Sequence, residues 1–139
     1  MAKTIIQKVT FKNTTPKAVY DLYMNPKKHA MISAAPAKIS SKPGAAYSVF
    51  GGYITGKNLH LVKDKLIVQT WRAQGWDKKD VDSTFIISLE PKGKDVVLQM
   101  IHANVPDKHE KSLAKGWNEH YWNTWKQHLA GKPITRPKM

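Results

Sequence analysis

Five segments between residues 45 and 102 alternate apolar and polar side chains, and this pattern constrains the fold more than any other feature. The segments read AAYSVF, YITGKNLHL, KLIVQTWR, STFIISLE and DVVLQMIH, and turn sequences such as GG, VKDK and PKGK separate them. Strands joined by connections this short pair with their neighbours along the chain as hairpins. The sequence therefore predicts an antiparallel meander with one apolar face, on which Gln69 and His102 are polar exceptions.

The residues before the meander predict one more strand and two short helices. Residues 3–11 alternate with a strand period. Thr15 is suited to cap a helix that starts at Pro16, and Pro26 ends that helix before a second short helical turn. In GGYITG, Gly51 and Gly52 indicate a turn or bulge, and Gly56 marks a place where the sheet bends or the helix comes close.

A long helix over about 108–130 follows the meander, and Gly131 ends it. At 100° per residue one face of this helix carries a largely aromatic stripe, and Trp122 lies off it. The members of the stripe are Leu113, Trp117, Tyr121, Thr124, Trp125 and His128. We predict an α+β fold in which a curved antiparallel sheet wraps around this helix. Residues 1–131 form one domain in this interpretation, and 132–139 form a mobile basic tail.

Composition narrows the classes of partner and site. The chain has 23 Lys and Arg against 10 Asp and Glu, a formal charge of +13, which favours acidic partners. It has no cysteine, so disulfides and thiolate metal sites are excluded. No stretch approaches the ~20 apolar residues that span a bilayer, so we expect a cytoplasmic protein without a membrane span.

Several of these segments together resemble the C-terminal domain of the activator of heat-shock protein 90 ATPase, a branch of the START-like (SRPBCC) helix-grip superfamily. The resemblance is carried by GGYITGKNLHLVKDKLIVQTWRAQGW, DSTFIISLEP, MIHANVP and GWNEHYWNTWKQHL, and it runs from the TPKAVYDLY helix to the terminal helix. It implies a helix-grip fold with a hydrophobic cavity between sheet and helix, and no shared set of catalytic residues. It also implies a role in chaperone activation and the stress response.

The leading functional hypothesis is a non-enzymatic START-like domain that binds a small apolar ligand in this cavity. The expected lining consists of Phe50, Ile54, Trp71, Phe85, Met100, His102, Trp117 and Tyr121. Two interpretations stay open for the aromatic residues of the helix, since they can be plain core or a cavity wall. His102 is either a core group with satisfied hydrogen bonds or a polar contact that orients a ligand.

The alternative hypothesis is a co-chaperone-like module that binds an acidic surface of the 90-kDa heat-shock chaperone through its lysines and modulates its ATPase. A third hypothesis, nucleic-acid binding, would depend on the positive charge and on an exposed Trp122 that stacks on bases. We do not expect this function. His120 and His128 lack metal-ligand spacing, so we expect no metal and no cofactor. The predicted inner face carries no carboxylate, so an acid–base pair is not indicated.

Overall fold

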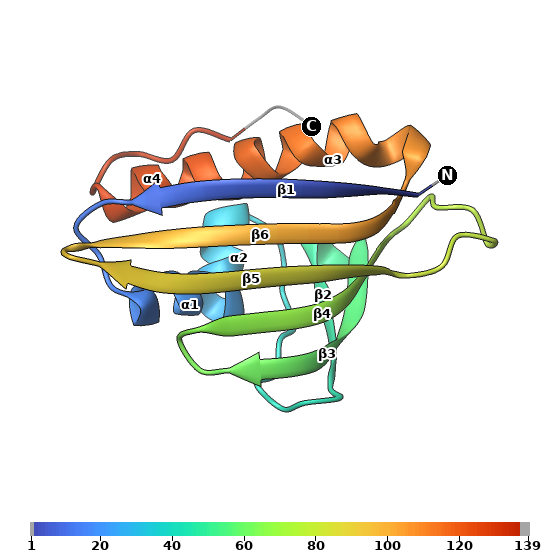
Figure 1. Cartoon of the computed structure of the whole chain (residues 1–139), viewed down its shortest axis with the longest axis horizontal. Coiled ribbons are helices and arrows are strands. Elements are labelled where there is room, and N and C mark those ends of the chain that lie inside the picture. The colour runs from blue at the N-terminus through green and yellow to red at the C-terminus, as the bar shows by residue number, and fades with distance from the viewer. Residues whose placement is uncertain (1, 137–139) are drawn as a thin grey trace.

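Six antiparallel strands curve around a C-terminal helix in the computed structural model, which describes residues 2–136 (Figure 1). The strands are β1 (Ala2–Phe11), β2 (Ala46–Val49), β3 (Ile54–Val62), β4 (Leu66–Ala73), β5 (Ser83–Lys92) and β6 (Asp95–Pro106). The helices are α1 (Pro16–Met24), α2 (Pro26–Ser33), α3 (Glu110–Gly116) and α4 (Asn123–Leu129). Short 3₁₀ turns lie at Phe50–Gly52 and Asp107–His109, and a π turn at Trp117–Trp122 joins α3 to α4.

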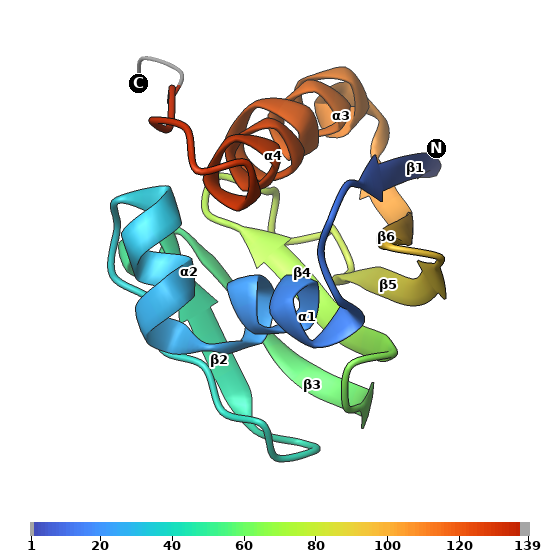
Figure 2. The ribbon, with the colours of Figure 1, turned by 90° about the vertical axis from the view of Figure 1, so that its left-hand side faces the viewer.

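The order of strands in the sheet is β1-β6-β5-β4-β3-β2, so β2 to β6 form the predicted meander and β1 pairs with β6. Figure 2 shows the sheet curling beneath the terminal helix, with α1 and α2 at one end of the concave side. Thr15 caps α1 through its hydroxyl and Pro16 opens it, as the sequence predicts. The α+β helix-grip prediction is confirmed.

Gly56 lies where β3 bends against β4. A Cβ at this position would overlap the carbonyl oxygen of Thr70 and the ring of Tyr47. The Tyr47 hydroxyl donates to that same oxygen at 2.6 Å, and the backbone N–H of Lys57 donates to the Thr70 hydroxyl at 2.8 Å. Only glycine therefore permits this bend. The element that comes closest to Gly56 is strand β4 and not the terminal helix, so of the two alternatives for this glycine the bend is the one found.

Gln69, the first polar exception, is buried and joins three parts of the chain. Its Oε1 accepts from the Tyr23 hydroxyl of α1 at 2.9 Å, and its Nε2 donates to Asn58 Oδ1 of β3 at 2.9 Å. Asn58 Nδ2 in turn donates to the carbonyls of Ser40 and Lys42 in the segment before β2. These bonds satisfy the buried amides, so the polar side chains specify how α1 and the loop sit on the sheet.

The π turn overturns the prediction for Trp122. This residue is only 1% exposed and packs beside Trp117 and Trp125, so the expectation that it lies off the buried stripe was wrong. A π turn holds an extra residue, which brings both Tyr121 and Trp122 to the sheet side. Gln7 of β1 supports the turn, because its Oε1 accepts from Trp122 Nε1 at 2.7 Å and its Nε2 donates to the Ala114 carbonyl at 2.9 Å.

The segment after the terminal helix runs back toward α2. Arg136 donates to the carbonyls of Ile32 at 2.7 Å and Met31 at 2.9 Å. The backbone N–H of Thr135 donates to Gln127 Oε1 at 2.8 Å. Of the tail predicted to be mobile, 132–139, residues 137–139 lie outside the described residues.

We expect Trp125→Ala to lower the free energy of unfolding by about 3–5 kcal/mol, because it removes a buried indole that packs on Phe11 and Tyr23 and leaves a cavity. Urea denaturation followed by far-UV circular dichroism measures the change. Val81→Ala, at an exposed loop position, is the control and should shift the midpoint little. Equal midpoints for the two variants would contradict this account of the core.

Candidate ligand pocket

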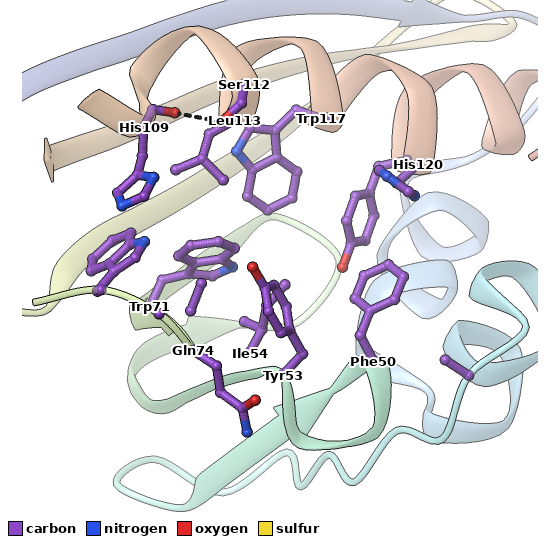
Figure 3. A pocket seen from close by; sticks show the side chains of 16 residues that line it. Phe50, Tyr53, Ile54, Trp71, Gln74, His109, Ser112, Leu113, Trp117 and His120 are labelled. Carbon is purple, nitrogen blue, oxygen red and sulfur yellow. Dashed lines mark hydrogen bonds between the residues drawn. The ribbon is translucent and has the colours of Figure 1, made fainter. Parts of the chain in front are cut away.

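A pocket of about 610 Å³ lies between α3 and the strands β3 and β4 (Figure 3). Leu113 and Trp117 of the helix face Ile54 and Trp71 of the sheet across it. Twelve further residues from β4, the loops and the helix complete the lining: Ala35, Phe50, Tyr53, Ala73, Gln74, Gly75, Trp76, His109, Ser112, Gly116, His120 and Tyr121. Ligand pockets of proteins commonly have volumes in the range of ~300–1,000 Å³.

The turn before β3 closes one end of the pocket. Phe50, Gly51 and Gly52 all have positive φ angles, of 53°, 66° and 96°, so the two glycines fit the left-handed backbone that the turn requires. The turn predicted at Gly51 and Gly52 is therefore confirmed. It places the Phe50 ring edge-on to His120 at 5.7 Å and to Tyr121 at 6.0 Å, where it bridges sheet and helix.

Trp76 and His109 close the other end. Their rings stack at 6.0 Å with an interplanar angle of 11°. Arg72 lies over the Trp76 ring at 5.9 Å and donates to the carbonyls of Asp77, at 2.8 Å, and Asp80, which fixes the loop that carries Trp76. The walls are strongly aromatic, since Phe50, Tyr53, Trp71, Trp76, Trp117 and Tyr121 are all lining residues. None of the lining residues is Asp, Glu, Lys or Arg.

A chain of hydrogen bonds lies below the pocket and joins the helix to the sheet. Trp117 Nε1 donates to His102 Nδ1 at 3.1 Å, so the imidazole proton is on Nε2. His102 Nε2 donates to the Ser83 oxygen at 2.8 Å, and the Ser83 hydroxyl donates to the Trp71 carbonyl at 2.6 Å. Because each donor has one acceptor, this chain defines the tautomer of His102 and the direction of the Ser83 proton.

Burial lowers the pKa of His102 to about 3, so the ring is neutral near pH 7. The Ser83 proton points to the Trp71 carbonyl and the His102 Nε2 proton points to Ser83, so the contact between Ser83 and His102 is not that of a nucleophile with its base. The structure shows His102 as a core group with satisfied hydrogen bonds.

A second buried histidine orients the hydroxyl of Tyr121. His29 Nδ1 donates to the Tyr23 carbonyl at 3.0 Å, so its Nε2 accepts from the Tyr121 hydroxyl at 3.2 Å. Burial lowers the pKa of His29, which keeps the ring neutral and able to accept. Tyr121 therefore presents its ring, and not its hydroxyl proton, to the pocket.

Two lining residues carry buried polar atoms that have no hydrogen-bond partner among residues 2–136. These atoms are Trp71 Nε1 and His109 Nε2. Trp71 is only 2% exposed. A buried donor without an acceptor costs about 1–3 kcal/mol of stability. The pocket thus has apolar walls with two polar atoms that are not satisfied by the protein.

Five of the eight residues predicted to line a cavity do so: Phe50, Ile54, Trp71, Trp117 and Tyr121. Phe85, Met100 and His102 are buried on the same face of the sheet but do not line the pocket. The Phe85 ring lies flat against Trp117 at 4.4 Å, so it supports the wall from behind.

Sequence reasoning missed the two loop aromatics, Tyr53 and Trp76, and the helix histidines, His109 and His120. Strand alternation would place Tyr53 on the face opposite to Ile54, but Tyr53 lies in the turn before β3 and lines the same pocket. The position of Trp76 depends on the loop geometry set by Arg72, and alternation carries no signal for that.

Two kinds of feature are absent from residues 2–136. No helix in this range is both long and apolar enough to cross a membrane. No group of three His, Asp or Glu side chains in it is arranged to hold a metal ion.

Comparison with known proteins identifies the family. Residues 13–130 match the family model described as Activator of Hsp90 ATPase homolog 1-like protein. The chain belongs to this family. It is 30% identical over 116 residues to an activator of 90 kDa heat shock protein ATPase homolog from Dictyostelium discoideum, and 25% identical over 123 residues to the human homolog 1.

The alignments cover 83% and 86% of this chain but 30% and 36% of those relatives, so the chain spans about a third of their length. The crystal structure of an Hsp90 activator from Plasmodium falciparum superposes with a TM-score of 0.82 at 20% identity. That match covers 95% of this chain and 99% of the other, and it shows a shared fold.

We expect the stability of the Activator of Hsp90 ATPase homolog 1-like domain to fall as pH is lowered from about 6.5 toward 3. The pKa of His102 is lower in the folded state than in the unfolded chain, so within this window the unfolded chain binds more protons. One proton corresponds to a slope of about 1.4 kcal/mol per pH unit. His29 adds a slope of the same sign, because burial lowers its pKa too.

Urea denaturation at a series of pH values measures this slope. His102→Gln retains hydrogen-bonding groups and does not titrate, so its slope should be smaller than that of the parent. Identical slopes in parent and variant would show that His102 does not titrate as described.

Proposed function

We propose that this domain binds a small apolar molecule in the pocket between α3 and strands β3 and β4. The observation that carries the proposal is an aromatic pocket of about 610 Å³ whose lining includes no Asp, Glu, Lys or Arg. Below α4, the buried aromatic side chains of Trp122 and Trp125 fill the core. At α3 the helix instead presents Ser112, Leu113 and Gly116 to the opposite wall.

The rim of the pocket supports entry from solvent. Tyr53 is 52% exposed, and Gln74 and Ser112 are also exposed lining residues. The buried rings of Trp71 and Trp117 lie deeper. A ligand that entered past the rim would remove apolar surface from water on both partners, which is the main driving force for such binding.

Ala35→Phe should weaken binding of naphthalene about tenfold, because the new ring would occupy part of the pocket from a half-buried loop position. Isothermal titration calorimetry measures the dissociation constant, and quenching of tryptophan emission gives a second readout. Ala46→Phe, at an exposed position of β2, adds the same ring outside the pocket and serves as the control. Equal naphthalene affinities for parent and Ala35→Phe would sink the proposal.

A second candidate function is association with an acidic surface of the 90-kDa heat-shock chaperone in the cytoplasm. Family membership favours it, because relatives are named as activators of that chaperone's ATPase. A specific surface also favours it. Ile6, Ile101, Ile86 and Val68 are register partners across β1, β6, β5 and β4 and form an aliphatic row on the outer face of the sheet.

The aliphatic row is accessible at its β1 end and lies beside basic charge. Ile6 is 73% exposed and Ile101 36%. Lys8 follows two residues after Ile6 on the same strand face and is exposed. An apolar strip beside lysines suits a partner surface that is apolar at its centre and acidic at its rim.

Ile6→Glu should reduce capture of the purified 90-kDa chaperone at least tenfold, since it places an acidic group in the row. Pull-down at increasing salt measures binding, which should weaken because charge attraction is screened over ~10 Å at 0.1 M salt. Val81→Glu is a matched control, because Val81 is 72% exposed but lies outside the row. Absence of binding at low salt, with an unchanged ATPase rate of the chaperone, would count against this candidate.

A further inference from the structure

Trp71 differs from two other buried tryptophans that pack against the sheet. Trp117 Nε1 donates to His102 and Trp122 Nε1 donates to Gln7, so those indoles are satisfied within the protein. Trp71 Nε1 has no acceptor among residues 2–136, although its ring is almost completely buried. Its ring lies in the wall of the pocket that faces Leu113 and Trp117 (Figure 3).

A second unsatisfied atom lies in the same pocket. His109 Nε2 is buried without a partner, and the His109 ring stacks on Trp76, which itself packs on Trp71 at 5.7 Å. Two of the three buried side-chain atoms without a partner in the described chain thus belong to lining residues; the third is Asp64 Oδ1. Buried polar atoms are nearly always hydrogen-bonded. The two unsatisfied atoms near Trp71, Trp76 and His109 therefore indicate that this part of the pocket wall accommodates a polar group of a ligand.

The chemistry of that partner follows from the donor and the walls. An indole N–H only donates, so its partner carries a hydrogen-bond acceptor. The lining has no Asp, Glu, Lys or Arg to balance an ion, and burying an unpaired charge is costly, so we take the partner to be neutral. Trp71 and Trp117 contact each other at 5.9 Å, so a ligand lies beside this pair and not between the two rings. An aromatic wall of this kind favours a flat molecule that packs against it.

We propose that the Trp71 N–H is the specificity-determining donor of this pocket and that it selects neutral, planar aromatic ligands that bear an acceptor oxygen. The inference rests on the proposed ligand-binding function and adds the class of ligand. Neighbouring side chains cover the N–H, so a ligand acceptor reaches it by displacing part of the wall. The gain is a hydrogen bond that the free protein does not make.

The test compares two probes of similar size and shape. Coumarin is neutral and planar and has a carbonyl acceptor, whereas naphthalene has none. Isothermal titration calorimetry gives the affinity of both probes for the parent, for Trp71→Phe and for Trp76→Phe. Trp76→Phe makes the same ring truncation in the same pocket without removing the proposed donor. We expect Trp71→Phe to weaken coumarin about fivefold to tenfold and naphthalene less than twofold, and Trp76→Phe to affect both probes alike.

A spectroscopic readout does not depend on any variant folding. In ¹H–¹⁵N spectra of the parent, the Trp71 indole proton should move downfield when coumarin is added and much less when naphthalene is added. The indole resonances of Trp117 and Trp122, which already have acceptors, should not show this difference.

The outcomes separate this inference from the proposed function. The inference would be overturned if both probes bind, Trp71→Phe and Trp76→Phe lower the affinity for each probe equally, and the Trp71 indole proton shows no selective shift. The proposed binding of apolar molecules in the pocket would be unaffected by that result. Failure of both probes to bind would remove the proposed function itself. Tighter binding of 2-naphthoate than of coumarin, at 0.15 M salt, would overturn the requirement for a neutral ligand.

Discussion

The hydrogen-bond chain from Trp117 through His102 and Ser83 to the Trp71 carbonyl is the constraint on which the rest of this structure depends. It links the terminal helix to β6, β5 and β4 in turn. Apolar packing is not directional, and a helix held by packing alone could slide or rotate on the sheet. The bonded indole fixes both movements, because its donor must meet one nitrogen of a neutral imidazole. This contact therefore sets the distance between α3 and the sheet, and that distance sets the size of the pocket.

The terminal helix has two halves with different roles, and the π turn divides them. On the α4 side, Trp122 and Trp125 pack against Tyr121 and against α1, and this half is solid core. On the α3 side, Leu113 and Gly116 leave room above Ile54. Gln7 supports the division from β1, because it holds a carbonyl of α3 and an indole of the π turn with one amide group. The same helix therefore anchors the core at one end and borders the pocket at the other.

The sequence predicted the elements well, because their periodicity reflects one apolar face per strand. It also showed that Gln69 and His102 face inward, although alternation cannot reveal what they bond to. Alternation gives the face of a residue and not its position along the pocket, so Phe85 and Met100 could not be distinguished from Trp71. Trp122 was misplaced because an ideal helix turns 100° per residue, and the π turn departs from that angle. Its contact partner Gln7 lies 115 residues away in sequence, so local periodicity carries no sign of this contact.

The pairing of β1 with β6 joins the first strand of the domain to the last. Closing such a long loop costs conformational entropy before any contact forms, which slows folding. During synthesis β1 is made before its partner β6. Until β6 is available, Ile5, Val9 and Phe11, which are buried in the folded domain, stay exposed to solvent. Until β1 docks, β6 remains an open edge and Gln7 cannot hold the π turn. Docking of β1 therefore does two things at once, because it covers the edge of β6 and brings in the amide that supports the terminal helix.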